Sequence, residues 1–337
     1  MEIRRRERLD RGVKVRADSI YAVSSLKEIM FLAGPVLALV LGLFILPLVM
    51  PNAYWQRVLC IAGVYALLSI GFDFLANYVG LVCLGGAFFV GVGGYISGLL
   101  NSAFGVPPAL AIPAATVAGA FLCTLTLLPC LPLRGVYFAI VSFIYPLVAE
   151  RLVAATGIFG GTEGITGLNV LKNIWVNQYL ILVVVLTALF ILLRLVNHLD
   201  AGLVYRGVKD NDQAIRASGI SVTRYKAQAV LISALPGCFA GAYLTHLYGW
   251  VGMSLFAIDF SILPLAATVV GGSGTLYGPL IGSLLLVPAS EALRNFGTLR
   301  IVFYSVTIVL FIVFWTEGVM RYLQRKYEQF ERWERIS

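Results

Sequence analysis

The chain has 337 residues, of which 59% are hydrophobic and only 12% are charged, and its mean hydropathy is +0.88. A soluble globular domain carries roughly 25% charged residues, so this composition excludes a soluble globular protein and indicates an integral membrane protein. The net charge of +8 sits in terminal and loop positions, where membrane topology explains it better than nucleic-acid binding does.

The N-terminal arm, residues 1–29, mixes basic and acidic side chains and precedes the first apolar run. A cleavable signal peptide places its hydrophobic region much nearer the start. The arm is therefore not expected to be a cleavable signal peptide, and its basic residues favour the cytoplasmic side. It is either a solvated tail near anionic lipid or an element that binds a partner.

Ten apolar stretches follow the arm, and most reach the roughly 20 residues that a spanning helix needs. The eighth and ninth are short and are separated only by the sequence GGSGTLYG, so they form either two short spans or one re-entrant pair. Ten spans are preferred over eight or nine. The expected spans are 30–49, 57–77, 81–101, 109–130, 135–154, 178–196, 226–248, 258–272, 277–293 and 300–318.

Two features of the early spans and their loops are informative. The segment GLVCLGGAFFVGVGGY, residues 80–95, is dense in glycine, which suits either close helix packing or a translocation path. GxxxG pairs recur at Gly94, Gly237 and Gly278 and indicate ordinary packing. The longest exported loop, residues 157–173, either shapes the outer mouth or simply connects two spans.

Between the sixth and seventh spans lies a charged segment, residues 197–225, which is too polar to cross a bilayer. It contains the helix-forming run AIRA closed by Gly219, and the sequence DND just before it offers N-cap residues. A short helix exposed to the cytoplasm is a surface that a soluble motor protein can grip. The segment therefore indicates a membrane subunit of a larger machine.

The distribution of Lys and Arg fixes the orientation, because cytoplasmic segments carry the excess. The opposite orientation would reverse this rule, and an odd number of spans would place the basic tail, residues 319–337, outside. Both termini of the membrane domain, residues 30–318, are therefore expected to face the cytoplasm. Of the 25 Lys and Arg residues, only Arg57, Arg151, Lys172, Arg294 and Arg300 then fall outside.

The sequence contains no catalytic or metal-binding constellation. Its five cysteines lie in apolar stretches without zinc spacing and are expected to be small buried hydrophobes. His198 is expected at a membrane edge and His246 in packing. No phosphate-binding GxxxxGK[ST] loop occurs, so any nucleotide energy must come from another chain. No span carries a charge near its middle, which counts against a proton-coupled carrier.

Five segments, taken in order, resemble the membrane subunits of branched-chain amino-acid-type ABC importers, and the LivM-type more closely than the LivH-type. The similarity covers roughly residues 57–317. The segments are NYVGLVCLGGAFFVGVGGY, LRGVYFAIVSF, GGTEGITGL, GLVYRGVKDNDQAIRASGISVTRYKAQAVLISALPGCFAGA and VVGGSGTLYGPLIGSLLL.

The resemblance implies an all-α integral membrane protein with the ABC importer permease fold and about ten transmembrane helices. It implies a non-catalytic subunit, in the bacterial inner membrane, that binds no cofactor or metal. The implied partners are a second, LivH-like permease subunit, two cytoplasmic ATPase subunits that use ATP and Mg²⁺, and an external solute-binding protein.

The resemblance also implies roles for individual residues. In the charged loop the ATPase-coupling pattern of ABC importers reads Gln213, Ala214, Ile215 and then Gly219, without the usual acidic first residue. The expected ATPase-coupling residues are Arg206, Asp210, Asp212, Gln213, Ala214, Arg216 and Gly219. The expected translocation-path residues are Phe88, Phe89, Gly91, Tyr95, Tyr137 and Phe138.

Three departures from the family pattern bear on the solute. Cys83 stands where serine is usual, Gly86 stands where histidine is usual, and Pro146 lies in a segment that commonly reads TLAFGE. The solute is therefore left open among amino acids, urea or amides, and small carboxylic acids. The alternative function is an independent secondary transporter or channel, which would work without an ATPase. A membrane enzyme is a weaker third reading.

Overall fold

The computed structural model describes residues 52–133, 135–171 and 173–293, together with the single positions 42, 44, 302, 306, 309, 318 and 320. The expected N-terminal arm lies outside the described residues. The first and last expected spans, 30–49 and 300–318, and the C-terminal tail lie outside them except at those single positions.

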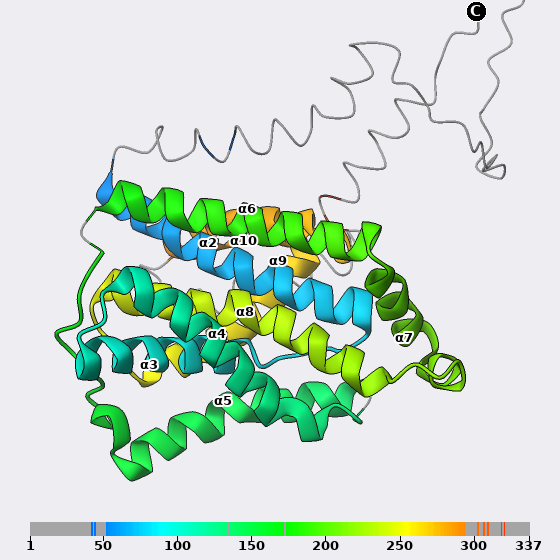
Figure 1. The fold of residues 1–337 in the computed structure, drawn as a ribbon. Helices are drawn as coiled ribbons and strands as arrows, with labels where there is room; N and C mark the ends of the chain where they lie inside the picture. The colour runs from blue at the N-terminus through cyan, green and yellow to red at the C-terminus, as the bar shows by residue number, and fades with distance from the viewer. Residues whose placement is uncertain are drawn as a thin grey trace, which may run out of the picture.

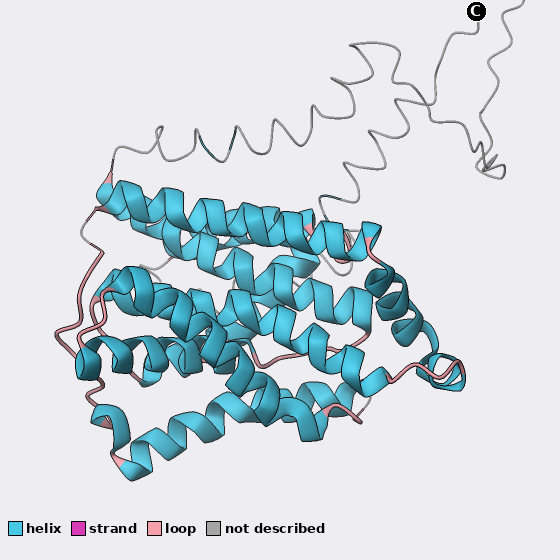
Figure 2. Cartoon of the chain, in the orientation of Figure 1, coloured by secondary structure: helices cyan, strands magenta, loops and turns pink. Residues whose placement is uncertain are grey.

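Every regular element in the described ranges is a helix (Figure 2). The elements in chain order are α2 (Ala53–Asp73), the π-helix η1 (Phe74–Val79), α3 (Gly86–Phe104), α4 (Pro108–Leu127), η2 (Leu128–Cys130), α5 (Val136–Thr156), η3 (Ile158–Gly160), α6 (Ile174–His198), α7 (Asp200–Ala217), α8 (Val222–Tyr248), η4 (Met253–Phe256), α9 (Asp259–Gly271) and α10 (Tyr277–Ala292). The labels η2, η3 and η4 denote short 3₁₀-helices.

Seven described segments are long and apolar enough to cross a membrane. They match the second to eighth expected spans, with ends shifted by several residues, and they confirm a multi-pass helical membrane protein. The segments are Ala53–Val79, Gly86–Phe104, Pro108–Cys130, Val136–Thr156, Ile174–His198, Val222–Tyr248 and Met253–Gly271. The ninth expected span corresponds to α10, whose 16 residues make it shorter than a typical spanning helix.

The helices pack in two groups, which are joined by the contacts of α2 with α8 and of α3 with α9. In one group α8 lies against both α3 and α4, and α3 also packs on α4. In the other group α2 packs on α6, α9 and α10, and α9 pairs with α10. Figure 1 shows α5 at the edge of the first group and α7 at one end of the bundle, which is called the α7 end below.

The contact between α3 and α8 is a seam of backbone atoms. A Cβ added to Gly241 would lie 1.9 Å from the carbonyl oxygen of Val90, and one added to Gly93 would lie 2.2 Å from the carbonyl oxygen of Cys238. Small residues allow this close approach, which drives helix association in lipid. The packing prediction for the GxxxG pair at Gly237 is therefore confirmed.

Close backbone contact at glycine residues also joins α9 to α10. A Cβ added to Gly271 would lie 1.8 Å from the carbonyl oxygen of Gly278, and one added to Gly282 would lie 1.9 Å from that of Ala267. The two short helices therefore form a tight hairpin. Its turn, residues 272–276, lies near the α7 end of α2, because the Asp73 carboxylate accepts hydrogen bonds from backbone N–H groups of that turn.

Residues 80–85 contain no helix, so the expectation of a span starting at residue 81 is wrong by several residues. Gly80 has φ +78° and ends η1. The chain then has no regular secondary structure until α3 begins at Gly86. Two serine hydroxyls take the place of intrahelical partners: Ser142 Oγ accepts from Leu84 N (2.9 Å), and Ser261 Oγ accepts from Ala87 N (3.1 Å).

The loop at residues 157–173 packs against the chain that follows α8. Ile165 forms an isolated antiparallel bridge with Val251. His246 is fully buried, with Nε2 2.9 Å from Ser97 Oγ and Nδ1 2.8 Å from the carbonyl oxygen of Asn169. The histidine therefore joins α8, α3 and the loop, as the packing prediction expected.

Candidate functional site

The charged segment between α6 and α8 holds two helical parts, together labelled α7, which are separated by a kink at Asn211 (φ −157°, ψ 97°). The short helix that the sequence predicted is the part after the kink, and the helical part before the kink was not expected. The side chain of Asn211 accepts hydrogen bonds from the backbone N–H groups of Gln213 (3.1 Å) and Ala214 (3.2 Å). Asn211 is thus the N-cap of the part after the kink, as the DND sequence predicted.

The end of α7 is also as expected. Gly219 has φ +81°. Its N–H donates to the carbonyl of Arg216 (3.0 Å), and the N–H of Ile220 donates to the carbonyl of Ile215 (3.3 Å). This pair of bonds is a Schellman motif, which requires a left-handed residue after the helix. The short helical part after the kink is therefore capped at both ends.

The part of α7 before the kink is docked by buried side chains. The ring of Tyr205, which is 1% exposed, makes edge-on contacts with the rings of Phe74 (5.6 Å) and Tyr225 (5.9 Å). Burial raises the pKa of the Tyr205 phenol, which keeps it neutral. α7 is therefore attached to both η1 and α8.

Most of the expected coupling residues lie on the surface of α7. The exposed ones are Arg206, Asp210, Gln213, Ala214, Arg216 and Gly219. Asp212 differs, because its side chain is only 11% exposed and its Oδ2 lies 3.9 Å from both Lys226 Nζ and Arg216 Nη2. Since Lys226 is buried in α8, Asp212 holds the kinked turn against the membrane domain.

The expected path residues do not share one open surface within this chain. Phe88, Phe89, Tyr95 and Phe138 are buried, and Gly91 is packed so tightly that an added Cβ would clash with the Phe256 ring. Tyr137 is the exception, because it is 72% exposed on α5.

Of these six residues, Tyr95 lies in a cluster of aromatic rings. Its ring stacks on that of Phe256 (5.6 Å between centroids) and lies 6.0 Å from that of Phe159. Its hydroxyl is buried and makes no hydrogen bond.

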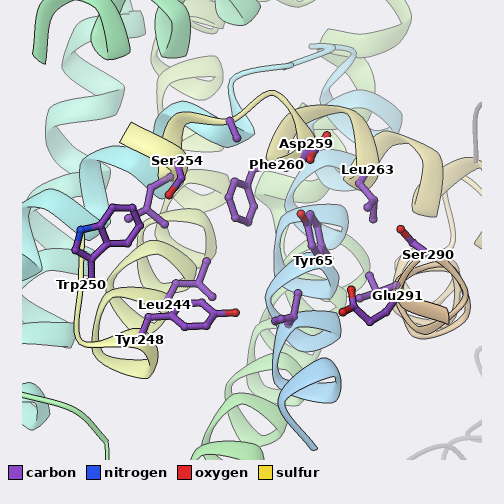
Figure 3. A pocket seen from close by; sticks show the side chains of 14 residues that line it. Tyr65, Leu244, Tyr248, Trp250, Ser254, Asp259, Phe260, Leu263, Ser290 and Glu291 are labelled. Atoms are coloured by element: carbon purple, nitrogen blue, oxygen red, sulfur yellow. The ribbon is translucent and has the colours of Figure 1, made fainter. Parts of the chain in front are cut away.

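A cavity of about 580 Å³ opens among α2, α8, α9, α10 and the chain around η4. Figure 3 shows Trp250 and Tyr248 on one side, Ser290 and Glu291 on the other, and Tyr65 and Phe260 between them. The rings of Tyr65 and Phe260 stack, with 5.4 Å between their centroids. The full lining is Ile61, Tyr65, Leu244, Tyr248, Trp250, Ser254, Leu255, Ala257, Asp259, Phe260, Leu263, Val287, Ser290 and Glu291.

The chemistry of this cavity combines an apolar and aromatic wall with two carboxyl groups. Asp259 stands at the start of α9, and Glu291, which accepts a hydrogen bond from the Tyr54 hydroxyl, stands near the end of α10. The described lining contains no Lys, Arg or His. Aromatic faces and carboxylates both attract a cationic group, so the cavity suits a small solute with an ammonium group and an apolar body.

Sequence reasoning missed this cavity. Asp259 and Glu291 look like charges at span ends, and Tyr65 lies in the middle of an apolar span. The available signal was the aromatic sequence HLYGW just before the short eighth span, with acidic residues at the start of that span and near the end of the ninth. That pattern does not reveal that α9 and α10 fold back as a hairpin against α2.

A second cavity, of about 340 Å³, lies beneath the kink of α7. It separates the kink from residues 79–81 and is lined by polar side chains, including Lys209, Asp210, Asp212 and Lys226. Metal-binding chemistry finds no support in the part of the chain that the structure describes, because no three His, Cys, Asp or Glu side chains cluster there.

Comparison with known proteins agrees with this architecture. The LivM permease proteins of high-affinity branched-chain amino acid transport systems from Salmonella typhimurium and Escherichia coli are each 27% identical over 288 residues, covering 76% of this chain and 68% of theirs. A probable LivM permease from Methanocaldococcus jannaschii is 23% identical, over 63% of this chain and 70% of its own. No solved structure matches.

The family described as the permease component of branched-chain amino acid transport systems matches residues 54–315. The match spans the helices α2 to α10, both cavities and the kinked helix α7. The chain therefore belongs to the family of branched-chain amino acid transport permease components.

Proposed function

We propose that this chain forms half of the translocation path of an ABC importer in the bacterial inner membrane. The other half is a related, LivH-like permease subunit. Two cytoplasmic ATPase subunits bind ATP and Mg²⁺, and an external solute-binding protein delivers the solute. The observation that carries the proposal is α7, a capped and kinked helix whose surface is exposed at one end of a family permease.

In this proposal the α7 end faces the cytoplasm, in agreement with the excess of Lys and Arg in the expected inside segments. ATP binding draws the ATPase subunits together, and α7 moves with them. The path then opens alternately to the two sides. ATP and solute drive this change only through their different affinities for the two states.

The 580 Å³ cavity narrows the solute class. It lies in the half of the bundle away from α7, since it includes Tyr248 at the end of α8. Its carboxyl groups and aromatic walls support a solute that carries an ammonium group, with its apolar body against Leu263 and Val287. Small carboxylic acids without an amino group fit this cavity poorly. Among the solutes that the sequence left open, we therefore favour an amino acid.

The test is affinity purification of the chain from native membranes, followed by reconstitution of what comes with it in liposomes. We expect one or two ATPases and a second permease subunit to co-purify, and we expect ATP-dependent uptake of leucine, isoleucine or valine with added binding protein. A chain that purifies alone and transports solute without ATP would instead be an independent carrier or channel.

Gly219 provides a point test of coupling. A Cβ at this position meets no atom within 4 Å, but φ +81° costs an L-residue about 1–2 kcal/mol. We expect Gly219→Val to open the Schellman turn and reduce uptake per ATP hydrolysed, while Gly219→Asn, which tolerates the left-handed region, retains it. Normal coupling in the valine variant would contradict the role of this turn.

A further inference from the structure

The turn of the α9–α10 hairpin, residues 272–276, is held by one buried carboxylate. Asp73 is fully buried. Its Oδ1 accepts a hydrogen bond from the backbone N–H of Gly274 (2.7 Å), and its Oδ2 accepts from that of Leu276 (3.1 Å). Leu276 has φ +58°, a conformation that a leucine keeps only when its surroundings enforce it. Asp73 therefore sets the shape of the turn.

The same carboxylate is connected to α7. Asn77 Nδ2 donates to Asp73 Oδ1 (2.7 Å), and the backbone carbonyl of Asn77 accepts from Lys209 Nζ (2.8 Å). A continuous hydrogen-bonded path thus runs from Lys209 on α7, through Asn77 and Asp73 on α2 and η1, to the turn of the hairpin. Lys209 is part of α7, so it moves when that helix moves.

A second, parallel connection uses the neighbouring residue of η1. The Tyr78 hydroxyl donates to the carbonyl of Gly274 (2.8 Å), and the guanidinium of Arg206 on α7 lies 5.8 Å from the centre of the Tyr78 ring. In an α-helix Tyr78 would lie about 140° around the axis from Asp73. The π-helical turn η1 lets Asp73 and Tyr78 reach the same turn. Such π-bulges are frequent at functional sites.

The hairpin that receives these contacts also forms a wall of the large cavity. Asp259, Phe260 and Leu263 belong to α9, and Val287, Ser290 and Glu291 belong to α10. The glycine contacts at Gly271 and Gly282 join the two helices without intervening side chains, so the hairpin moves as a unit. A displacement of its turn is therefore transmitted to the cavity wall.

We propose that Lys209, Asn77 and Asp73 are positioning residues that link the movement of α7 to the solute cavity through the α9–α10 hairpin. The inference rests on the proposed function. It adds a route that does not pass through α6 or α8, the two helices that flank α7. This route is a contiguous physical network, which is the kind of structure that carries coupling between distant sites.

The experiment uses the reconstituted importer and compares uptake per ATP hydrolysed in Lys209→Met, Asn77→Ala and the double variant. We expect each single variant to lower this ratio by about two- to tenfold, the range of loss produced by one hydrogen bond of typical strength. We expect the double variant to resemble the single ones, because both remove contacts of one path.

The matched control is Ser233→Ala. It removes another buried hydrogen bond to α2, from Ser233 Oγ to the carbonyl of Gly71 (3.0 Å), which is not part of the path. If the control lowers the ratio as much as Lys209→Met does, the effect comes from general destabilisation of α2 and not from loss of the path. Unchanged ratios in both single variants would overturn the proposal.

A second readout follows the cavity wall directly. In a Ser290→Cys variant, we expect ATP to change the rate of labelling of the new thiol by a water-soluble reagent, and we expect Lys209→Met to abolish that change. An ATP response that persists in Lys209→Met would place the coupling elsewhere. If the wild-type complex shows no ATP-driven uptake at all, the proposed function fails, and that result is distinct from failure of the path.

Discussion

Replacing Gly241 with valine is expected to prevent the subunit from folding stably. The added Cβ would lie 1.9 Å from the carbonyl oxygen of Val90 and 2.9 Å from the backbone nitrogen of Gly94. Overpacking of a core costs typically about 1–3 kcal/mol when side chains can shift. Here the obstacle is backbone, so α3 and α8 must separate, and we expect a loss of about 3 kcal/mol or more.

The measurement is the midpoint of thermal unfolding of the purified complex, together with the yield of monodisperse protein in detergent. Ala118→Val is the matched control, because Ala118 lies on the exposed face of α4 and gains the same side chain without a neighbour to displace. A Gly241→Val variant with the yield and midpoint of the control would show that the α3–α8 seam does not stabilise the fold.

Replacing Asp259 with asparagine is expected to raise the KM for the transported amino acid by about 10- to 100-fold. The change removes the negative charge at the start of α9 and keeps the shape of the side chain. A hydrogen bond to a charged group is worth about 1.5–3 kcal/mol, and this range corresponds to the expected change in KM. The measurement is the concentration dependence of ATP-driven uptake.

Two comparisons make this result specific. Glu163→Gln removes the same charge from an exposed position in the loop after α5, and we expect it to leave KM unchanged. A branched carboxylic acid without an amino group is expected to compete poorly in the wild type and better in Asp259→Asn. An unchanged KM for the amino acid in the Asp259 variant would show that the cavity is not part of the translocation path.

The sequence predicted the parts of the fold that depend on local chemistry. The apolar runs located the second to eighth spans, since a membrane helix must satisfy its backbone internally and face lipid. The N-cap at Asn211 and the end of α7 at Gly219 follow from the side chain and the backbone freedom of those residues. Such features need no knowledge of distant contacts.

The features that the sequence did not predict depend on tertiary partners. The first part of α7 reads as a polar loop until Tyr205 is seen to lie against Phe74 and Tyr225. The break before α3 is hidden in an apolar run, because the hydroxyls that satisfy its backbone come from α5 and α9.

The same limit applies to the candidate site. The expected coupling residues lie on one exposed helix, and apart from Asp212 the structure leaves them accessible at its surface. The cavity instead gathers residues from α2, α8, α9 and α10. No motif in the sequence links those helices. The assigned roles of both sets stay predictions until the variants are measured.

The position of Asp73 has a consequence for how the protein is made. Its two backbone partners, Gly274 and Leu276, are 201 and 203 residues further along the chain. The ribosome therefore delivers α2 to the membrane long before the turn that binds this carboxylate exists. A buried carboxylate is costly until its hydrogen bonds are complete, so a chain truncated before the α9–α10 hairpin carries a defect in its first described helix. We therefore expect such an unfinished chain to be less stable at α2 than the complete one.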